Sequence, residues 1–366
     1  MENAVKTAEG LPVQEESMKP RVSAAGIRKR VTSNVNMAAL SVIIQQFVIV
    51  LIAIVASIAL IVFFALNGKE GTSLLKDAGV LLAITGISAV AADIVAALFI
   101  AKTVKLKGLK KSFRAPAGGI LDLILPAFAV AGCSQIIATL LMLIPIFNNS
   151  NDALGKALNI DITNPLSVIA GVLYLVILAP VLEEILCRGM ILRVGSSISN
   201  KFGLILSALL FSFMHMNFLQ GVNTFVMGLI LGYITIKSGS IIPAIIAHIF
   251  NNGIAVGSIF VEGMLGEAVA EKYDLYLPYV LGALGVVSVI ILLVRHKKLD
   301  EANDRSLESN IRVSDEMIEE AGVRRDVIAK YALSRSWAFW VILGLFTVCG
   351  IGMLFLQTIA HFMLNR

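Results

Sequence analysis

Apolar stretches of about twenty residues recur along most of this chain and constrain its fold more than any other feature. Each stretch is long enough to cross the hydrocarbon core of a bilayer as an α-helix. Charged residues make up only 15% of the chain, whereas a soluble globular protein usually carries about 25%. The strands of a membrane β-barrel would instead alternate apolar and polar residues. The sequence therefore predicts an all-α polytopic membrane protein.

About nine transmembrane helices are expected from these stretches. Their approximate cores are 39–66, 78–101, 120–147, 165–190, 202–218, 221–236, 241–260, 275–295 and 337–362. Basic residues gather after the second, fourth, sixth and eighth cores, whereas the loop 148–164 holds only Lys156. Because Lys and Arg are retained on the cytoplasmic side, this alternation predicts a cytoplasmic N-terminus and a C-terminus on the opposite side. The net charge of +5 is concentrated in these loops, which indicates orientation against anionic lipid and no binding of nucleic acid.

Composition divides the chain into six segments. They are a cytoplasmic polar tail over 1–36, the first three spans over 37–150, a core with polar motifs over 160–260, the eighth span with its flanks over 261–298, a charged cytoplasmic linker over 299–336 and a last span over 337–366. The linker has a partly helical rhythm between Met317 and Ile328. We expect a solvated helical linker there, with a regulatory or partner-docking segment as the alternative.

A pair of adjacent acidic residues, Glu183 and Glu184, falls near the middle of the fourth span. An ionised carboxylate in hydrocarbon costs several kcal/mol, so such residues are functional-site candidates by default. Two neighbouring carboxylates raise the cost, because each opposes the ionisation of the other. Arg188 lies one helical turn beyond Glu184 on the same face. We therefore expect Arg188 to pair with Glu184 and to hold it ionised.

Two later spans carry further polar motifs. Phe211 and His215 share one face of the fifth span, and His248 and Asn252 share one face of the seventh, because residues four apart lie one turn apart. At about 1.5 Å per residue, Glu183, His215 and His248 lie roughly 16, 22 and 12 Å from the inner ends of their helices. These depths allow one shared cavity that opens toward the cytoplasm. The deep carboxylates Asp93 and Asp122 are weaker candidates for the same cavity.

The residue types of this set are those that transfer protons and stabilise negative charge. A carboxylate in a low dielectric can take a proton from water, and an imidazole can donate to a developing oxyanion or bind a metal ion. The common serine, aspartyl and zincin patterns of intramembrane proteases are absent from the sequence. The three cysteines form no close pair, which argues against a disulfide framework or a thiolate zinc cluster.

The three motifs, in this order and at these separations, resemble the CAAX protease and bacteriocin-processing family. That family includes the Ras-converting prenyl endopeptidase of eukaryotes and bacterial bacteriocin-immunity and surface-display proteins. The resemblance covers about 165–260, so the family core is the fourth to seventh helices. The ninth span and the linker over 299–336 depart from the eight-span plan of the family. The resemblance implies an endopeptidase in the plasma membrane of a bacterium, acting on a membrane-associated peptide or protein that is lipidated or unmodified.

The resemblance also implies roles for the motif residues. Glu183 is the base that activates water, and His215, His248 and Asn252 complete the catalytic set; Glu184, Arg188 and Phe211 support it. The cofactor stays open: Glu183, His215 and His248 supply three ligands of a zinc site, or the enzyme works with no metal, which we favour. The alternative from another class is a non-catalytic scaffold, a bacteriocin-immunity factor or a proton-coupled transporter that uses the same buried polar cluster.

Overall fold

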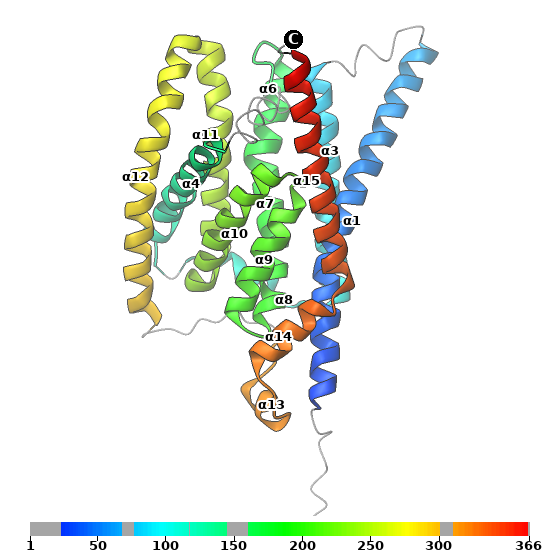
Figure 1. Cartoon of the computed structure of the whole chain (residues 1–366), viewed down its shortest axis with the longest axis vertical. Coiled ribbons are helices and arrows are strands. Elements are labelled where there is room, and N and C mark those ends of the chain that lie inside the picture. The colour runs from blue at the N-terminus through cyan, green and yellow to red at the C-terminus, as the bar shows by residue number, and fades with distance from the viewer. Residues whose placement is uncertain (1–22, 68–76, 117, 145–159, 301–309, 365–366) are drawn as a thin grey trace, which may run out of the picture.

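The fold is an all-helical bundle, shown in Figure 1 as a computed structural model that describes residues 23–67, 77–116, 118–144, 160–300 and 310–364. These residues form helices and contain no strand, so the all-α prediction is confirmed. The seven longest continuous helices are α1 (Ala24–Leu66), α3 (Ala78–Thr103), α4 (Leu121–Met142), α10 (Phe218–Ser238), α11 (Ile242–Leu265), α12 (Glu267–Asp300) and α15 (Trp337–Leu364). The shorter ones are η1 (Leu109–Phe113), α9 (Asn200–Met214), α13 (Asp315–Glu320) and α14 (Arg325–Ser334).

The fourth span is a composite of five pieces. They are α6 (Pro165–Gly171), the π-helix η2 (Val172–Leu178), α7 (Ala179–Glu184), the π-helix η3 (Ile185–Ile191) and α8 (Leu192–Ser196). With this composite, eight helices in the described part of the chain are long and apolar enough to cross a membrane.

The segment expected as the fifth span, 202–218, forms the shorter apolar helix α9 instead. Its 15 residues reach about 22 Å, which is less than the roughly 30 Å of a hydrocarbon core. The helix stops because Met216 takes a positive φ of 50° and the Asn217 side chain caps the first turn of α10. The expected count of nine spans is therefore corrected to eight, plus one helix that ends inside the bundle. In Figure 1 the turn from α9 to α10 lies at mid-height.

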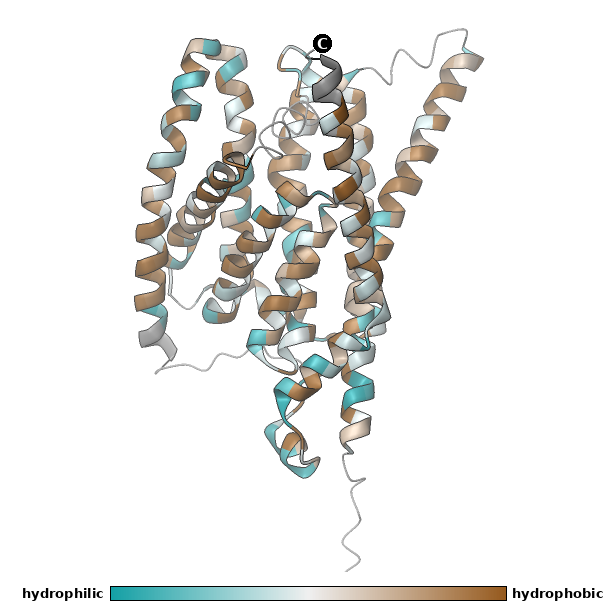
Figure 2. Cartoon of the chain, in the orientation of Figure 1, coloured by the Kyte–Doolittle hydropathy of each residue, from teal (hydrophilic) through white to brown (hydrophobic). Residues whose placement is uncertain are grey.

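The helix α9 still reverses the direction of the chain. Consequently the start of α1 and the end of α15 lie at opposite ends of the bundle (Figure 1). Figure 2 shows hydrophilic residues at the start of α1 and along α13, at the lower end of the view, and hydrophobic residues through the middle of the helices. This is the arrangement that a bilayer requires of spanning helices.

The first helix begins at Ala24, within the segment 1–36 that was expected as a polar tail. The Ser23 side chain caps it by accepting a hydrogen bond from the backbone N–H of Gly26. Residues spaced by four, Ile27, Val31 and Val35, are almost fully buried on one face. At 43 residues, α1 is about 65 Å long, so it extends well beyond a hydrocarbon core, and its first turns contact α14.

The described part of the charged linker, residues 310–336, is packed against the bundle. Val313, Ile328 and Ala332 have no exposed surface and join the main core. The backbone N–H of Val313 donates to the Ser197 carbonyl at 2.9 Å. The expectation of a solvated linker is thus wrong for these residues, because their apolar side chains pack on the ends of neighbouring helices. Residues 301–309 of the expected linker lie outside the described residues.

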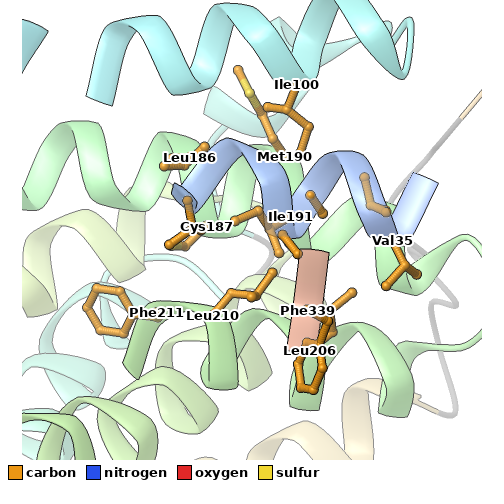
Figure 3. Packing of buried hydrophobic residues seen from close by; sticks show 14 of the residues in the cluster. Val35, Ile100, Leu186, Cys187, Met190, Ile191, Leu206, Leu210, Phe211 and Phe339 are labelled. Atoms are coloured by element: carbon orange, nitrogen blue, oxygen red, sulfur yellow. The ribbon is translucent and has the colours of Figure 1, made fainter. Parts of the chain in front are cut away.

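The main core joins elements that are far apart in the sequence. Figure 3 shows Val35 of α1, Ile100 of α3, Leu186 and Ile191 of η3, and Phe339 of α15 in one cluster with residues of α9. Phe211 belongs to the same cluster and has no exposed surface. The rotation of α9 and of the fourth span is therefore fixed by packing next to the polar motifs.

Candidate active site

Two π-helical segments flank the glutamate pair on the fourth span. Such segments are rare and occur frequently at functional sites. In a π-helix the carbonyl of Leu175 would accept from the residue five positions later, which is Pro180 and has no N–H. The side chain of Asn252 supplies the missing donor, with Nδ2 2.9 Å from the Leu175 oxygen. Asn252 therefore ties α11 to the irregular part of the fourth span.

Glu184 lies at the centre of a buried charge network. Its Oε1 atom accepts from Arg188 Nη1 at 2.7 Å and from His248 Nδ1 at 2.9 Å, and the Glu184 and Arg188 side chains have no exposed surface. Arg188 Nη2 also donates to the Gly228 carbonyl at 3.3 Å. Its guanidinium lies 4.4 Å from the centre of the Phe211 ring, a cation–π contact. The expected Arg188–Glu184 pairing is thus present.

Glu183 has a different environment from its neighbour. Its side chain is 18% exposed, and its Oε2 atom lies 3.8 Å from His248 Nε2. That distance is too long for a direct hydrogen bond. Arg188 and His248 therefore hold Oε1 of the fully buried Glu184, whereas the Glu183 carboxylate keeps some exposed surface.

The two motif histidines have the same orientation of their ring nitrogens. His215 caps the end of α9, and its Nδ1 lies 2.9 Å from the Phe211 carbonyl, which can only accept. His248 Nδ1 faces the Glu184 carboxylate in the same way. Both Nδ1 atoms therefore carry the hydrogen, and both Nε2 atoms are left for chemistry. The Phe211 ring makes an edge-to-face contact with each imidazole, and its centroid lies 5.1 Å from that of His215 and 5.6 Å from that of His248.

Of the two deep carboxylates that were weaker candidates, the structure brings one, Asp93, to the site. Asp93 on α3 is 3% exposed and accepts from Gln45 Nε2 at 2.6 Å. Helix α3 packs against η2 and α7 of the fourth span, so Asp93 borders the site beside Glu183. The available signal was a single Asp inside an apolar span. Asp122 instead lies beside Arg295 and His296, at 3.7 Å from each.

A metal site does not fit these residues. No three His, Cys, Asp or Glu side chains within the described ranges are placed so that they could hold a metal ion together. An open catalytic zinc site needs three converging protein ligands. The expected ligand set of Glu183, His215 and His248 therefore does not form a zinc site in this arrangement.

Comparison with known proteins matches residues 165–254 to the family described as Type II CAAX prenyl endopeptidase Rce1-like. No curated protein and no solved structure matches the chain. The matched residues include Glu183, His215, His248 and Asn252, whereas α1, α3, α12 and α15 lie outside them.

Proposed function

Through residues 165–254 the chain belongs to the Rce1-like family of CAAX prenyl endopeptidases, and we propose that Glu183 activates the water that this membrane protease adds to a peptide bond. The observation that carries the proposal is the asymmetry of the glutamate pair. Glu184 has two hydrogen-bond donors and no exposed surface, whereas Glu183 is partly exposed beside the free Nε2 of His248. Only Glu183 has space for water.

Charge balance supports this assignment. Burying net charge is costly unless it is paired. Arg188 offsets Glu184, and a protonated His248 would offset Glu183, so that the four groups sum to zero. His248 would then present Nε2–H toward Glu183 and toward any oxyanion formed beside it. This state positions a hydrogen-bond donor before the reaction begins.

In the proposed reaction, Glu183 takes a proton from water as the water oxygen bonds to the carbonyl carbon of the peptide. The C=O π electrons move to oxygen, and His248 together with the second N–H of Asn252 stabilises that oxyanion. The first N–H of Asn252 remains on Leu175. His215 Nε2, a free acceptor, orients the water. Collapse of the intermediate breaks the C–N bond, and the proton on Glu183 passes to the leaving amine.

We place the site in a cavity between the fourth span, α9 and α11, open toward the cytoplasm of a bacterial cell. The basic residues of the loops after α3 and α8 support this orientation, because Lys and Arg are retained on the cytoplasmic side. The substrate class is a peptide at or in the membrane, and a prenylated C-terminal Cys-a-a-X peptide is one member of it.

The test compares membrane peptides by mass spectrometry from cells with the wild-type protein and with Glu183→Gln. The amide keeps the shape and removes the base, so we expect a folded protein whose cleavage is slower by about 10²–10⁴. Glu271→Gln, at an exposed position of α12, is the matched control and should cleave normally. Full cleavage by Glu183→Gln would refute the base assignment. Identical peptides with and without the wild-type protein would favour a non-catalytic scaffold or immunity factor.

A further inference from the structure

The turn that carries His215 has an irregular backbone at mid-height of the bundle. The helix α9 ends at Met214, Met216 takes a positive φ, and α10 begins at Phe218. Irregular backbone at membrane depth is tolerated only where protein buries it or where it lines a water-filled cavity. The elements that cover this turn therefore determine where the imidazole of His215 lies.

The last helix, α15, covers the turn with one aromatic side chain. The Phe346 ring is 9% exposed, and its centroid lies 5.1 Å from that of Phe213 and 5.2 Å from that of Phe218. Phe213 precedes the turn and Phe218 follows it, so Phe346 contacts both sides. A Cβ atom added at Gly221 would lie 2.6 Å from the Phe346 ring, and one at Gly350 would lie 2.7 Å from Phe218. The helices α10 and α15 are therefore in close contact at these two glycines, and a shift of either helix would require the aromatic side chains between them to repack.

The first helix holds the backbone of the same turn. Gln46 Nε2 donates to the Met214 carbonyl at 2.7 Å. That carbonyl belongs to the last residue of α9 and has no intrahelical donor, as at any helix C-terminus. Gln46 also donates to Gln45, which donates to Asp93. Contacts to α1 and α15 thus meet at the residues on either side of His215.

We propose that α15, the last span, positions His215 for catalysis through Phe346, with Gln46 of α1 as a second support. This inference rests on the proposed function. Phe346 contacts Phe213 and Phe218 and acts on His215 only through them, so it is a positioning residue. The linker contributes by returning the chain to α1, where Ser336 donates to the Asn36 side chain at 2.8 Å just before α15 begins. Figure 1 shows α15 beside α1 and across the turn.

The test replaces Phe346 by Ala and by Leu. Misplacing a catalytic group by about 1 Å can cost about 10²-fold in rate. We therefore expect Phe346→Ala to lower kcat by about 10- to 100-fold with little change in KM, and Phe346→Leu to fall between Ala and wild type. Phe355→Ala, on the same helix but with a side chain that is 65% exposed, should retain the wild-type kcat.

A second measurement reports on His215 without any substrate. Diethyl pyrocarbonate acylates free imidazole nitrogen, and mass spectrometry gives the rate at each histidine, with the buried His296 as internal reference. Phe346→Ala should change the rate at His215 severalfold, and Phe355→Ala should not. If wild type cleaves no peptide, the proposed function fails while this readout still tests the positioning. Wild-type kcat and wild-type His215 reactivity in folded Phe346→Ala would overturn the proposal. If that variant does not fold, the same result for Phe346→Leu would overturn it.

Discussion

The buried pair of Arg188 and Glu184 makes the strongest prediction about stability. In Arg188→Ala the Glu184 carboxylate keeps its contact with His248 and loses the 2.7 Å contact with the guanidinium. Removing one partner of a buried ion pair costs about 3–5 kcal/mol. Loss of the contact with the Phe211 ring adds up to about 2 kcal/mol. A total of about 4 kcal/mol would lower the folded-to-unfolded ratio by roughly 10³.

The assay is a double-mutant cycle of Arg188→Ala and Glu184→Gln in detergent micelles, with the free energy of unfolding as the measured quantity. Each single variant leaves one buried charge unpaired, whereas the double variant removes both. We therefore expect the double variant to lose at least about 2 kcal/mol less than the sum of the single losses. Arg324→Ala is the control, because Arg324 forms an exposed ion pair with Asp326 and such pairs contribute about 0–1 kcal/mol.

An Arg188→Ala protein within about 1 kcal/mol of wild type would refute this reasoning, since the value expected for an unpaired buried carboxylate is at least about three times larger. A coupling energy near zero in the cycle would refute it independently. Arg188→Lys tests the geometry: it keeps the charge but cannot reproduce the planar contacts with Phe211 and the Gly228 carbonyl, so its loss should be intermediate.

Four further predictions concern other parts of the molecule. Gly132→Ala should destabilise the protein, measured as a lower Tm, because the new Cβ would meet the Leu281 carbonyl of α12 at a distance too short for contact, whereas Gly344→Ala meets nothing within 4 Å and should be neutral. Arg325→Ala should speed hydrogen exchange over 310–334, because Arg325 donates to the Ile198 and Val313 carbonyls. Its partner Asp315 has a pKa lowered by the hydrogen bond from Arg325 and by the charge of Arg325. The contribution of this pair is therefore present above the ordinary Asp pKa and is lost only as pH falls through the lowered value, so the protection of these amides relative to their intrinsic exchange rates should be the same at pH 7 and pH 5. Cleavage should survive a chelator that reaches the site, and elemental analysis showing one zinc per chain that is absent from Glu183→Gln would contradict this. Cysteines introduced at Lys110 and near the end of α15 should be labelled from opposite sides of the membrane.

The local part of the site could be predicted from the sequence. The spacing of Arg188 and Glu184 is one helical turn, and such pairs follow from helix geometry alone. Asp93 was only a weaker candidate alongside Asp122, because its closeness to Glu183 depends on how α3 packs against α7, and no spacing along the chain encodes that. Hydropathy also cannot distinguish α9 from a full span, since the apolar residues continue through Met216 and Phe218 while the helix ends at Met214.

The linker was misjudged for a related reason. Its buried residues, such as Val313 and Ile328, are separated by charged ones, and this pattern is common to solvated and docked helices. A docked helix differs from a solvated one in having hydrogen-bond partners and apolar surface on distant elements. Here the backbone carbonyls of Ser197 and Ile198, at the end of α8, are such partners and accept hydrogen bonds from Val313 and Arg325. Only the folded chain brings these groups together.

The two π-helices of the fourth span have a consequence for the length of this segment. A π turn is an α-helix that has gained one residue, so the span holds extra residues in Val172–Leu178 and again in Ile185–Ile191. Because the wide turn absorbs the extra residue, deleting one residue inside either segment would restore a regular α-helix and leave its two flanks facing nearly the same way. Deleting one residue from the α-helical piece between them, Ala179–Glu184, would instead rotate everything beyond the deletion by about 100°. Both kinds of deletion should preserve helix content, but only the second should break the register between the Asn164–Asp77 contact at one end of the span and the packing of η3 on α9 at the other.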